Sequence, residues 1–160
     1  MTLTARAEAC HARAMEINGI AHVILTVADF QRCREFYGRL LPFFGMRPVA
    51  DAPNFFYCVG GRTAIGIEPA GDAHKHERFV QSRPGLHHVC FRVRERADVD
   101  AVHHELVAMG ATIVHPPEEG HWAPGYYSVL FEDPEGIRLE VNHVPGKGLL
   151  AAETPPNVRL

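Results

Sequence analysis

Three side chains have the types and spacing expected of a metal site: His22, His88 and Glu140. The two histidines lie in the similar apolar runs 20–27 and 86–93, which share the pattern H-V-x-x-x-V. Imidazole and carboxylate groups together bind divalent first-row metals, and two His with one carboxylate leave positions open for water or substrate. These residues therefore predict a site for one divalent transition metal, which would be Zn, Ni, Co, Mn or Fe.

The elements that would position these residues occur twice in the same order. The run 20–27 is followed by a helical pattern that Asp29 is suited to cap and that Pro42 is expected to end. After the run 86–93, apolar residues recur at helical spacing up to Gly110, a residue typical of helix ends. Three strands are expected after each helix: 47–49, 54–59 and 62–68, and then 112–115, 126–131 and 137–143. The sequence therefore predicts two copies of a βαβββ module.

Alternation along these strands indicates which side chains share a face, because successive strand residues point to opposite sides. The apolar positions should pack under the helices, which leaves His22, His88, Glu68 and Glu140 on the other face. The histidines are 66 residues apart (88 − 22) and the glutamates 72 (140 − 68), so we expect equivalent places in the two modules. Curved sheets would then bring the four side chains together. The alternative for Glu68 is a solvated carboxylate at a strand end, since Pro69 follows it.

The predicted fold class is α+β, with two tandem βαβββ modules forming a curved, barrel-like mixed sheet around the metal site. Neither module alone could bury the face of its sheet, so the two modules must pair within one domain, 18–144. The expected segments are an N-terminal arm (1–17), a first module (18–70), a linker (71–84), a second module (85–144) and a C-terminal tail (145–160).

Composition and charge exclude several classes of protein. The formal net charge is −3 and the 16 Lys and Arg residues are scattered, unlike the basic stripe of a nucleic-acid-binding protein. No apolar run approaches the roughly 18 residues that span a membrane, and the first residues lack the apolar core of a secretory signal. The four cysteines include no C-x-x-C pair. We therefore expect a cytoplasmic protein, with neither nucleic acid nor membrane as its partner.

Aromatic and polar residues near the end of the chain are candidates for a substrate pocket. His121 and Trp122 lie in the loop before the strand that Tyr126 begins, and Arg138 lies on the polar face of the last strand. Pocket walls usually combine aromatic side chains with a few polar groups. The alternative for this loop is an ordinary surface loop with a packed Trp. His87 has the wrong strand parity and is not expected in the site.

These features resemble the vicinal oxygen chelate superfamily, which contains glyoxalase I, methylmalonyl-CoA epimerase, extradiol dioxygenases, fosfomycin-resistance enzymes and bleomycin-binding proteins. The resemblance covers about residues 18–144 and rests on the segments IAHVILTVADF, REFYGRLL, GLHHVCFRV and FEDPEGIRLEV. It implies that His22, His88 and Glu140 bind the metal, with Glu68 matching the glutamate of glyoxalase-like members. It also implies that Glu140 or Glu68 is the catalytic base.

The function implied by the resemblance is that of a metal-dependent glyoxalase-like lyase or isomerase. It would act on a small vicinal-oxygen substrate through an enediolate-type intermediate, with the metal as Lewis acid. One alternative is an extradiol-type ring-cleaving dioxygenase, although such proteins commonly carry four modules where this chain has two. Another is a non-enzymatic drug-binding protein of the bleomycin-resistance kind, although such proteins typically lack the metal residues. One-domain members frequently pair, so we expect a homodimer by analogy.

Overall fold

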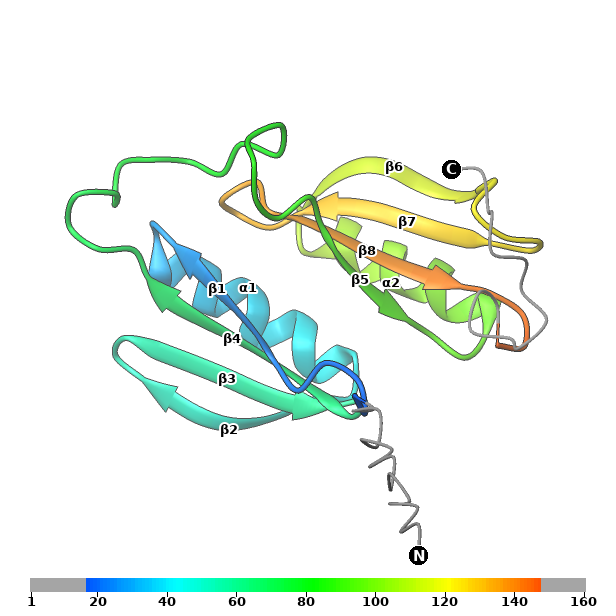
Figure 1. Cartoon of the computed structure of the whole chain (residues 1–160), viewed down its shortest axis with the longest axis horizontal. Coiled ribbons are helices and arrows are strands. Elements are labelled where there is room, and N and C mark those ends of the chain that lie inside the picture. The colour runs from blue at the N-terminus through cyan, green and yellow to red at the C-terminus, as the bar shows by residue number, and fades with distance from the viewer. Residues whose placement is uncertain (1–16, 148–160) are drawn as a thin grey trace, which may run out of the picture.

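The computed structural model describes residues 17–147, which form two βαβββ modules that lie side by side (Figure 1). The first module consists of β1 (Val23–Val27), α1 (Phe30–Phe43), β2 (Arg47–Ala52), β3 (Phe55–Gly60) and β4 (Thr63–Pro69). The second consists of β5 (Val89–Arg92), α2 (Arg96–Ala108), β6 (Thr112–Glu119), β7 (Tyr127–Glu132) and β8 (Arg138–His143). The predicted α+β class with two tandem βαβββ modules is therefore confirmed.

Each module forms a four-stranded mixed sheet that is covered on one face by its own helix (Figure 1). The strand orders are β1–β4–β3–β2 and β5–β8–β7–β6. β1 pairs with β4 in parallel, β5 pairs with β8 in parallel, and the remaining pairs are antiparallel. β1 and β5 are thus edge strands, and both lie toward the middle of the molecule in Figure 1.

Asp29 caps α1 as the sequence predicts, because its side-chain oxygen accepts a hydrogen bond from Arg32 N at 3.1 Å. The prediction that Pro42 ends this helix is wrong, since α1 continues one residue beyond it. Proline is tolerated there because it lies in the last turn, and Phe44 N still bonds Leu40 O at 3.0 Å. The residues that α1 buries recur at helical spacing: Phe30, Cys33, Tyr37, Leu40 and Leu41.

The second helix is bounded by clear local signals. A capping box begins it, in which Glu95 N donates to the Asp98 carboxylate at 3.1 Å. Gly110 follows its end with a φ of +67°, a left-handed conformation that glycine adopts without steric cost. Val102 and Leu106 are among its buried residues. The position of α2 was therefore predictable from its sequence.

Several strands differ from their expected bounds. β6 extends to Glu119 although it contains Pro116 and Pro117, and its pairing with β7 shifts register twice near them. A proline cannot donate to the sheet ladder, so an edge strand with irregular pairing is where it is tolerated. The turn between β3 and β4 falls one residue later than expected, with positive φ at Gly61 and Arg62.

One continuous hydrophobic core contains residues of both modules. Polar contacts also join them: the Tyr37 hydroxyl donates to the buried Asp133 carboxylate at 2.7 Å, and Arg39 bonds Glu105 at 2.6 Å. The other oxygen of Asp133 accepts two backbone N–H groups of its own turn between β7 and β8. This turn therefore closes a hairpin and also fixes α1 against the second module.

The segment that joins the modules, residues 70–88, contains turns but neither helix nor strand. Neither of the two described helices is long and apolar enough to cross a membrane. The predicted N-terminal arm lies outside the described residues except for Ile17, as does the predicted tail beyond Lys147.

Candidate metal centre

The second module brings His88 and Glu140 together on the sheet face opposite α2. β5 and β8 pair with Cys90 opposite Glu140, and His88 directly precedes β5. This register places His88 Nε2 3.1 Å from Glu140 Oε2. The side chain of Glu140 is 10% exposed and that of His88 is 33% exposed. The carboxylate is therefore held within the sheet surface while the imidazole remains open to solvent.

Tyr126 holds the other oxygen of the same carboxylate. Its hydroxyl donates to Glu140 Oε1 at 2.5 Å. Burial and this hydrogen bond raise the pKa of Tyr126, so the phenol keeps its proton and remains a donor. The loop before it is tightly built, since Gly120 N donates to Tyr126 O at 3.0 Å. A side chain on Gly120 would collide with the rings of Tyr126 and Trp122.

The paired donor atoms fit a divalent metal. Two ligand atoms that lie about 2.0–2.2 Å from one ion, at right angles to each other, are about 3 Å apart. The 3.1 Å separation of His88 Nε2 and Glu140 Oε2 matches that spacing. An imidazole nitrogen and a carboxylate oxygen are also typical ligands of first-row metals. Because Tyr126 binds Oε1, the oxygen that faces His88 stays available.

His22 does not join this pair within the described chain. It is exposed and directly precedes β1, as His88 directly precedes β5. Among residues 17–147, no three His, Cys, Asp or Glu side chains lie close enough to hold one metal ion. A single chain therefore brings together two of the predicted ligands and leaves His22 apart from them.

Glu68 and Glu140 do not occupy equivalent places, so that expectation is wrong. The register of β1 and β4 pairs Thr26 with Glu68, whereas that of β5 and β8 pairs Cys90 with Glu140. Counted from the histidine of each module, Glu140 lies opposite the second residue and Glu68 opposite the fourth. Glu68 is exposed, and its Oε1 lies 3.5 Å from Thr26 Oγ1. The strand register places Glu68 two residues beyond the position that corresponds to Glu140, and counting residues along the sequence cannot reveal this register.

Gly66 occupies the place in the first module that Glu140 has in the second, because it pairs with Ile24, the second residue after His22. A Cβ atom on Gly66 would lie 2.7 Å from Ile24 Cδ1 and 2.7 Å from Tyr57 Cδ2. The Tyr57 ring in turn stacks on Phe55, with ring centroids 5.6 Å apart. The first module therefore presents apolar and aromatic groups where the second presents a carboxylate.

A chain of hydrogen bonds reaches His88 from the linker. His87 Nδ1 lies 2.7 Å from His88 Nδ1, and the side-chain amide of Gln81 bonds His87 Nε2. Strand parity excluded His87 from the site, but β5 begins only at Val89, so alternation does not extend to residue 87. The signal that could have indicated this contact is the His-His pair itself, since neighbouring residues outside a strand can turn their rings together.

Two further groups near Glu140 were not predicted. Part of Cys90 is exposed, but burial of its thiol and the neighbouring Glu140 raise the pKa of Cys90 to about 12, so it stays protonated. Asn142 follows Glu140 on the same face of β8. Its side-chain oxygen is buried and has no hydrogen-bond partner among the described residues. This oxygen is therefore an unpaired acceptor that is closed off from solvent.

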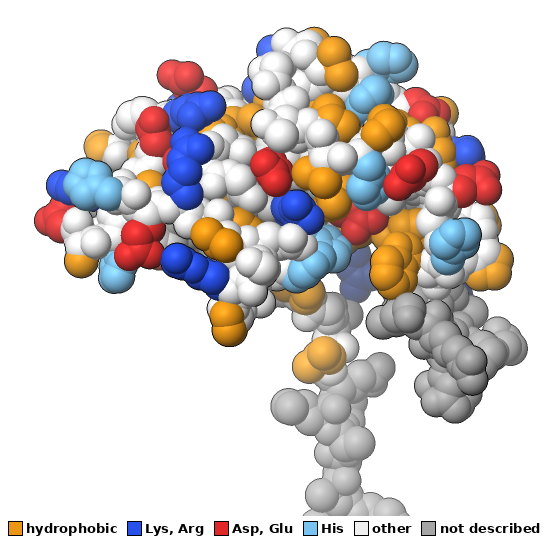
Figure 2. Space-filling view, turned by 90° about the horizontal axis from the view of Figure 1, so that it is seen from above, with side chains coloured by type: hydrophobic (Ala, Val, Ile, Leu, Met, Phe, Trp, Pro, Cys, Tyr) orange, Lys and Arg blue, Asp and Glu red, His pale blue; other side chains and the backbone are white. Residues whose placement is uncertain are grey.

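The predicted pocket residues have different environments. Tyr126 contacts Glu140 directly, whereas Arg138 Nε lies 3.5 Å from Glu132 Oε1. His121 is exposed, and Trp122 is 48% exposed, at the tip of the loop before β7. In Figure 2, histidine side chains are spread over this face of the molecule, some of them beside acidic side chains.

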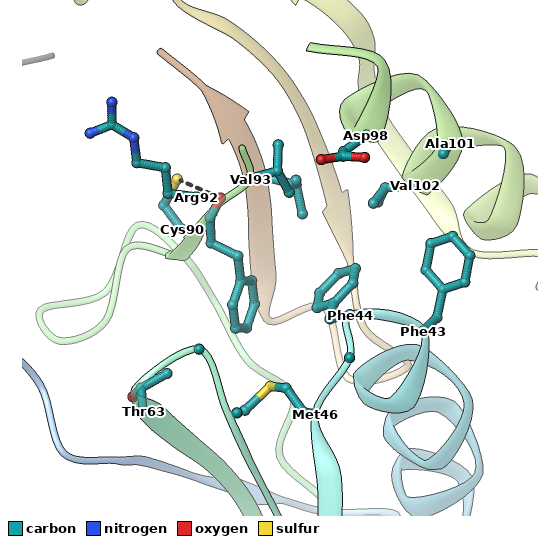
Figure 3. A pocket seen from close by; sticks show the side chains of 15 residues that line it. Phe43, Phe44, Met46, Thr63, Cys90, Arg92, Val93, Asp98, Ala101 and Val102 are labelled. Atoms are coloured by element: carbon teal, nitrogen blue, oxygen red, sulfur yellow. Dashed lines mark hydrogen bonds between the residues drawn. The ribbon is translucent and has the colours of Figure 1, made fainter. Parts of the chain in front are cut away.

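A cavity of about 580 Å³ lies between the two modules, beside the free edge of β5 (Figure 3). His88 and Glu140 are not among its lining residues, although Cys90, which pairs with Glu140, is. The cavity is therefore separate from the His88–Glu140 pair, and β5 borders both. Its apolar wall includes Phe43, Phe44, Met46, Val93 and Val102.

Solved structures show the same fold. A protein provisionally named a glyoxalase, from Bacillus halodurans, is 25% identical over 79% of this chain and 96% of its own, with a TM-score of 0.70. Lactoylglutathione lyase from Agrobacterium tumefaciens is 23% identical over 81% of this chain and 96% of its own, with a TM-score of 0.60. A fosfomycin resistance protein from Mesorhizobium loti is 19% identical over 81% and 94%, with a TM-score of 0.58.

None of the curated proteins matches this chain in sequence. The model of the Glyoxalase/Bleomycin resistance protein/Dioxygenase superfamily matches residues 19–141, which include the first module, nearly all of the second, and the residues His22, His88 and Glu140. A match over most of the chain, together with the shared two-module fold, establishes the family. This chain belongs to the Glyoxalase/Bleomycin resistance protein/Dioxygenase superfamily.

Proposed function

We propose that this chain is a metal-dependent enzyme of the glyoxalase-like type, a lyase or an isomerase, that acts on a small molecule with two adjacent oxygen atoms. The 3.1 Å contact between His88 Nε2 and Glu140 Oε2 carries the proposal. It holds a nitrogen donor and a carboxylate at a spacing that suits one divalent metal. The side chain of His88 is one-third exposed, so a small molecule can reach the pair, and Trp122 lies in the loop that leads to Tyr126.

The proposed ligands are His22, His88 and Glu140. Glu68 is left out because Gly66 has the place that corresponds to Glu140. Since His22 lies apart from the pair in one chain, we propose a homodimer in which each copy supplies His22 to the other. β1 and β5 are free sheet edges directly after the two histidines, so two copies can approach along these strands.

In the proposed reaction, the bound metal supplies Lewis acidity to the oxygens of the substrate. The carboxylate of Glu140 would act as the general base, which takes a proton from the carbon beside a carbonyl and returns it to a neighbouring atom. The Tyr126 hydroxyl, which donates to Oε1, keeps the carboxylate from rotating away.

One observation favours a second candidate, an extradiol-type dioxygenase. With Gly66 in place of a second carboxylate, the ligand set is two histidines and one glutamate. This set with open positions is typical of non-haem Fe(II) oxygenases. A drug-binding protein without metal has no such supporting observation, because it would leave the His88–Glu140 arrangement without a use.

Metal content tests the proposal directly. Purified protein without an affinity tag is loaded separately with Zn²⁺, Ni²⁺, Mn²⁺ and Fe²⁺, dialysed, and analysed by mass spectrometry beside His88→Ala. We expect about one metal per chain in the wild type and a loss of that metal in the variant. Proton exchange at C–H groups beside carbonyls would then mark the isomerase, and oxygen consumption with catechols would mark the dioxygenase. A wild type that binds none of the four metals overturns the proposal.

Mixing two defective variants tests the proposed dimer. His22→Ala keeps His88 and Glu140, whereas Glu140→Gln keeps His22. If each site uses two chains, random mixing restores about one quarter of the sites, because half of the dimers are mixed and each holds one intact site. A mixture that binds no more metal than the separate variants would show that each site is built within one chain.

A further inference from the structure

His88 uses both of its ring nitrogens in the structure. Nε2 lies 3.1 Å from Glu140 Oε2, and Nδ1 lies 2.7 Å from His87 Nδ1. The His87 ring meets the His88 ring edge-on, with centroids 5.0 Å apart and planes inclined by 72°. Beyond it, the side-chain amide nitrogen of Gln81 faces His87 Nε2. Three side chains thus form an unbroken line that ends on the carboxylate.

The direction of these hydrogen bonds follows from the number of protons on each ring. A neutral imidazole carries one N–H and one lone pair, so each ring can donate at one nitrogen and accept at the other. With the amide nitrogen of Gln81 as the first donor, His87 accepts at Nε2 and donates from Nδ1. His88 then accepts at Nδ1 and donates from Nε2 to Glu140.

A metal ion at His88 Nε2 requires the opposite direction. The metal takes the lone pair of Nε2, so the ring proton must lie on Nδ1. That N–H can donate to His87 Nδ1, which now accepts, and His87 carries its own proton on Nε2. His87 Nε2 then donates to the side-chain oxygen of Gln81. The amide of Gln81 must first rotate by a half-turn, which puts its acceptor oxygen where its donor nitrogen was.

We propose that His87 and Gln81 are positioning residues for His88, and that their line of hydrogen bonds reverses direction when His88 Nε2 becomes a metal ligand. The proton balance closes: His88 Nε2 releases a proton to water, His88 Nδ1 receives one from His87 Nδ1, and His87 Nε2 receives one from water. No net charge is taken up. This inference rests on the proposed function in that it takes His88 to be a ligand.

The first module provides a comparison. Ala21 precedes His22, where His87 precedes His88, so no equivalent line can form at the first histidine. The two histidines therefore differ in how firmly their rings are oriented. Loss of the partner that holds the second nitrogen of a ligating histidine typically lowers metal affinity by roughly 10- to 100-fold. Because His87 is exposed and water competes for it, we expect about 10-fold here.

Calorimetric titration with Zn²⁺ tests the role of His87 in the full chain. We expect His87→Ala to weaken Zn²⁺ binding about 10-fold. His87→Asn places an amide oxygen near the position of Nδ1, where it can accept from His88, and should recover most of the affinity. His104→Ala, a change at an exposed histidine of α2, is the control and should bind as the wild type does. Wild-type affinity in His87→Ala overturns the inference while leaving the proposed function intact.

Nitrogen NMR of the histidine rings gives a readout that does not depend on binding strength. At mildly alkaline pH, we expect the His88 proton on Nε2 in the metal-free protein and on Nδ1 after Zn²⁺ is added. In metal-free His87→Ala, the His88 ring should lose this preference, whereas His104→Ala should keep it. An unchanged His88 spectrum in metal-free His87→Ala overturns the inference. If the wild type binds none of the four metals but metal-free His87→Ala still loses the tautomer preference of His88, the proposed function is refuted and the positioning of His88 by His87 stands.

Discussion

In the second module, the sheet face opposite the helix holds His88 within 3.1 Å of Glu140. In the first module, the same face holds Gly66 under Ile24 and Tyr57, with no space for even one added methyl group. The strand order, the parallel edge pair and the position of the histidine before the first strand are the same in both. The repeated pattern therefore specifies the scaffold, while the individual residues on each sheet face decide what that face can bind.

The energetic reason for this difference lies in the cost of burying charge. A carboxylate in a sheet surface needs partners, because an unpaired buried charge is strongly destabilising. Glu140 has a hydroxyl donor on one oxygen and an imidazole beside the other. In the first module, the side chains of Ile24 and Tyr57 pack around Gly66 instead. The side chains around each position therefore suit the residue that is there, and placing a glutamate in the first module alone should not create a second site.

The largest effect is expected from replacing Glu140, with the same replacement at Glu68 as the comparison. Glu140→Gln should lower metal affinity by more than about 100-fold, because a neutral amide replaces the charged ligand. Glu68→Gln should leave metal binding unchanged, since Glu68 lies two residues out of register. Metal content and titration of both variants measure this, with the melting temperature as a check on folding. Equal losses in the two variants would restore Glu68 as a ligand, in line with the first expectation from sequence.

A smaller effect is expected from building a carboxylate into the first module. Gly66→Glu should destabilise the fold by about 1–3 kcal/mol, because the new side chain must displace Ile24 and Tyr57. Urea unfolding measures the change, and Gly71→Glu is the matched control, since an added Cβ there meets no atom within 4 Å. Tighter metal binding by Gly66→Glu would contradict the comparison, because it would show that the first face can act as the second does.

The smallest effect is expected at the junction of the modules. Tyr37→Phe removes a donor from buried Asp133 and should destabilise the fold by about 1–2 kcal/mol at neutral pH. Burial raises the pKa of Asp133, and the Tyr37 hydrogen bond opposes that rise. When the pKa of a carboxyl group is higher in the folded state than in the unfolded state, the free energy of unfolding falls as pH rises from the unfolded-state pKa to the folded-state pKa.

The pH dependence sharpens this last prediction. Without Tyr37, the pKa of Asp133 rises further, so the destabilisation should grow as pH increases from acidic to neutral. Below the ordinary carboxyl pKa, Asp133 is protonated in both states and this charge-dependent part vanishes. Urea unfolding of wild type and variant at both ends of this range measures the difference. Equal destabilisation at acidic and neutral pH would show that Asp133 is not the group affected.

Much of the scaffold could be predicted because its signals are local. Asp29 caps α1 through its own side chain, and Gly110 follows α2 in a left-handed conformation that few other residues adopt. Alternation correctly placed Leu25 and Leu139 in the core, since each strand has only two faces. Pro42 was misjudged because the cost of a proline depends on how many helical bonds follow it.

The site was only partly predictable from the same patterns. The sequence by itself determined the two modules, their paired histidines and the face on which Glu140 lies, because side-chain alternation and helix capping act over a few residues. Tertiary structure alone decided that Glu68 is out of register, that Gly66 is covered, that His87 reaches His88, and that His22 stays apart within one chain. These outcomes depend on strand pairing and on the docking of whole modules, which join residues that no local spacing relates.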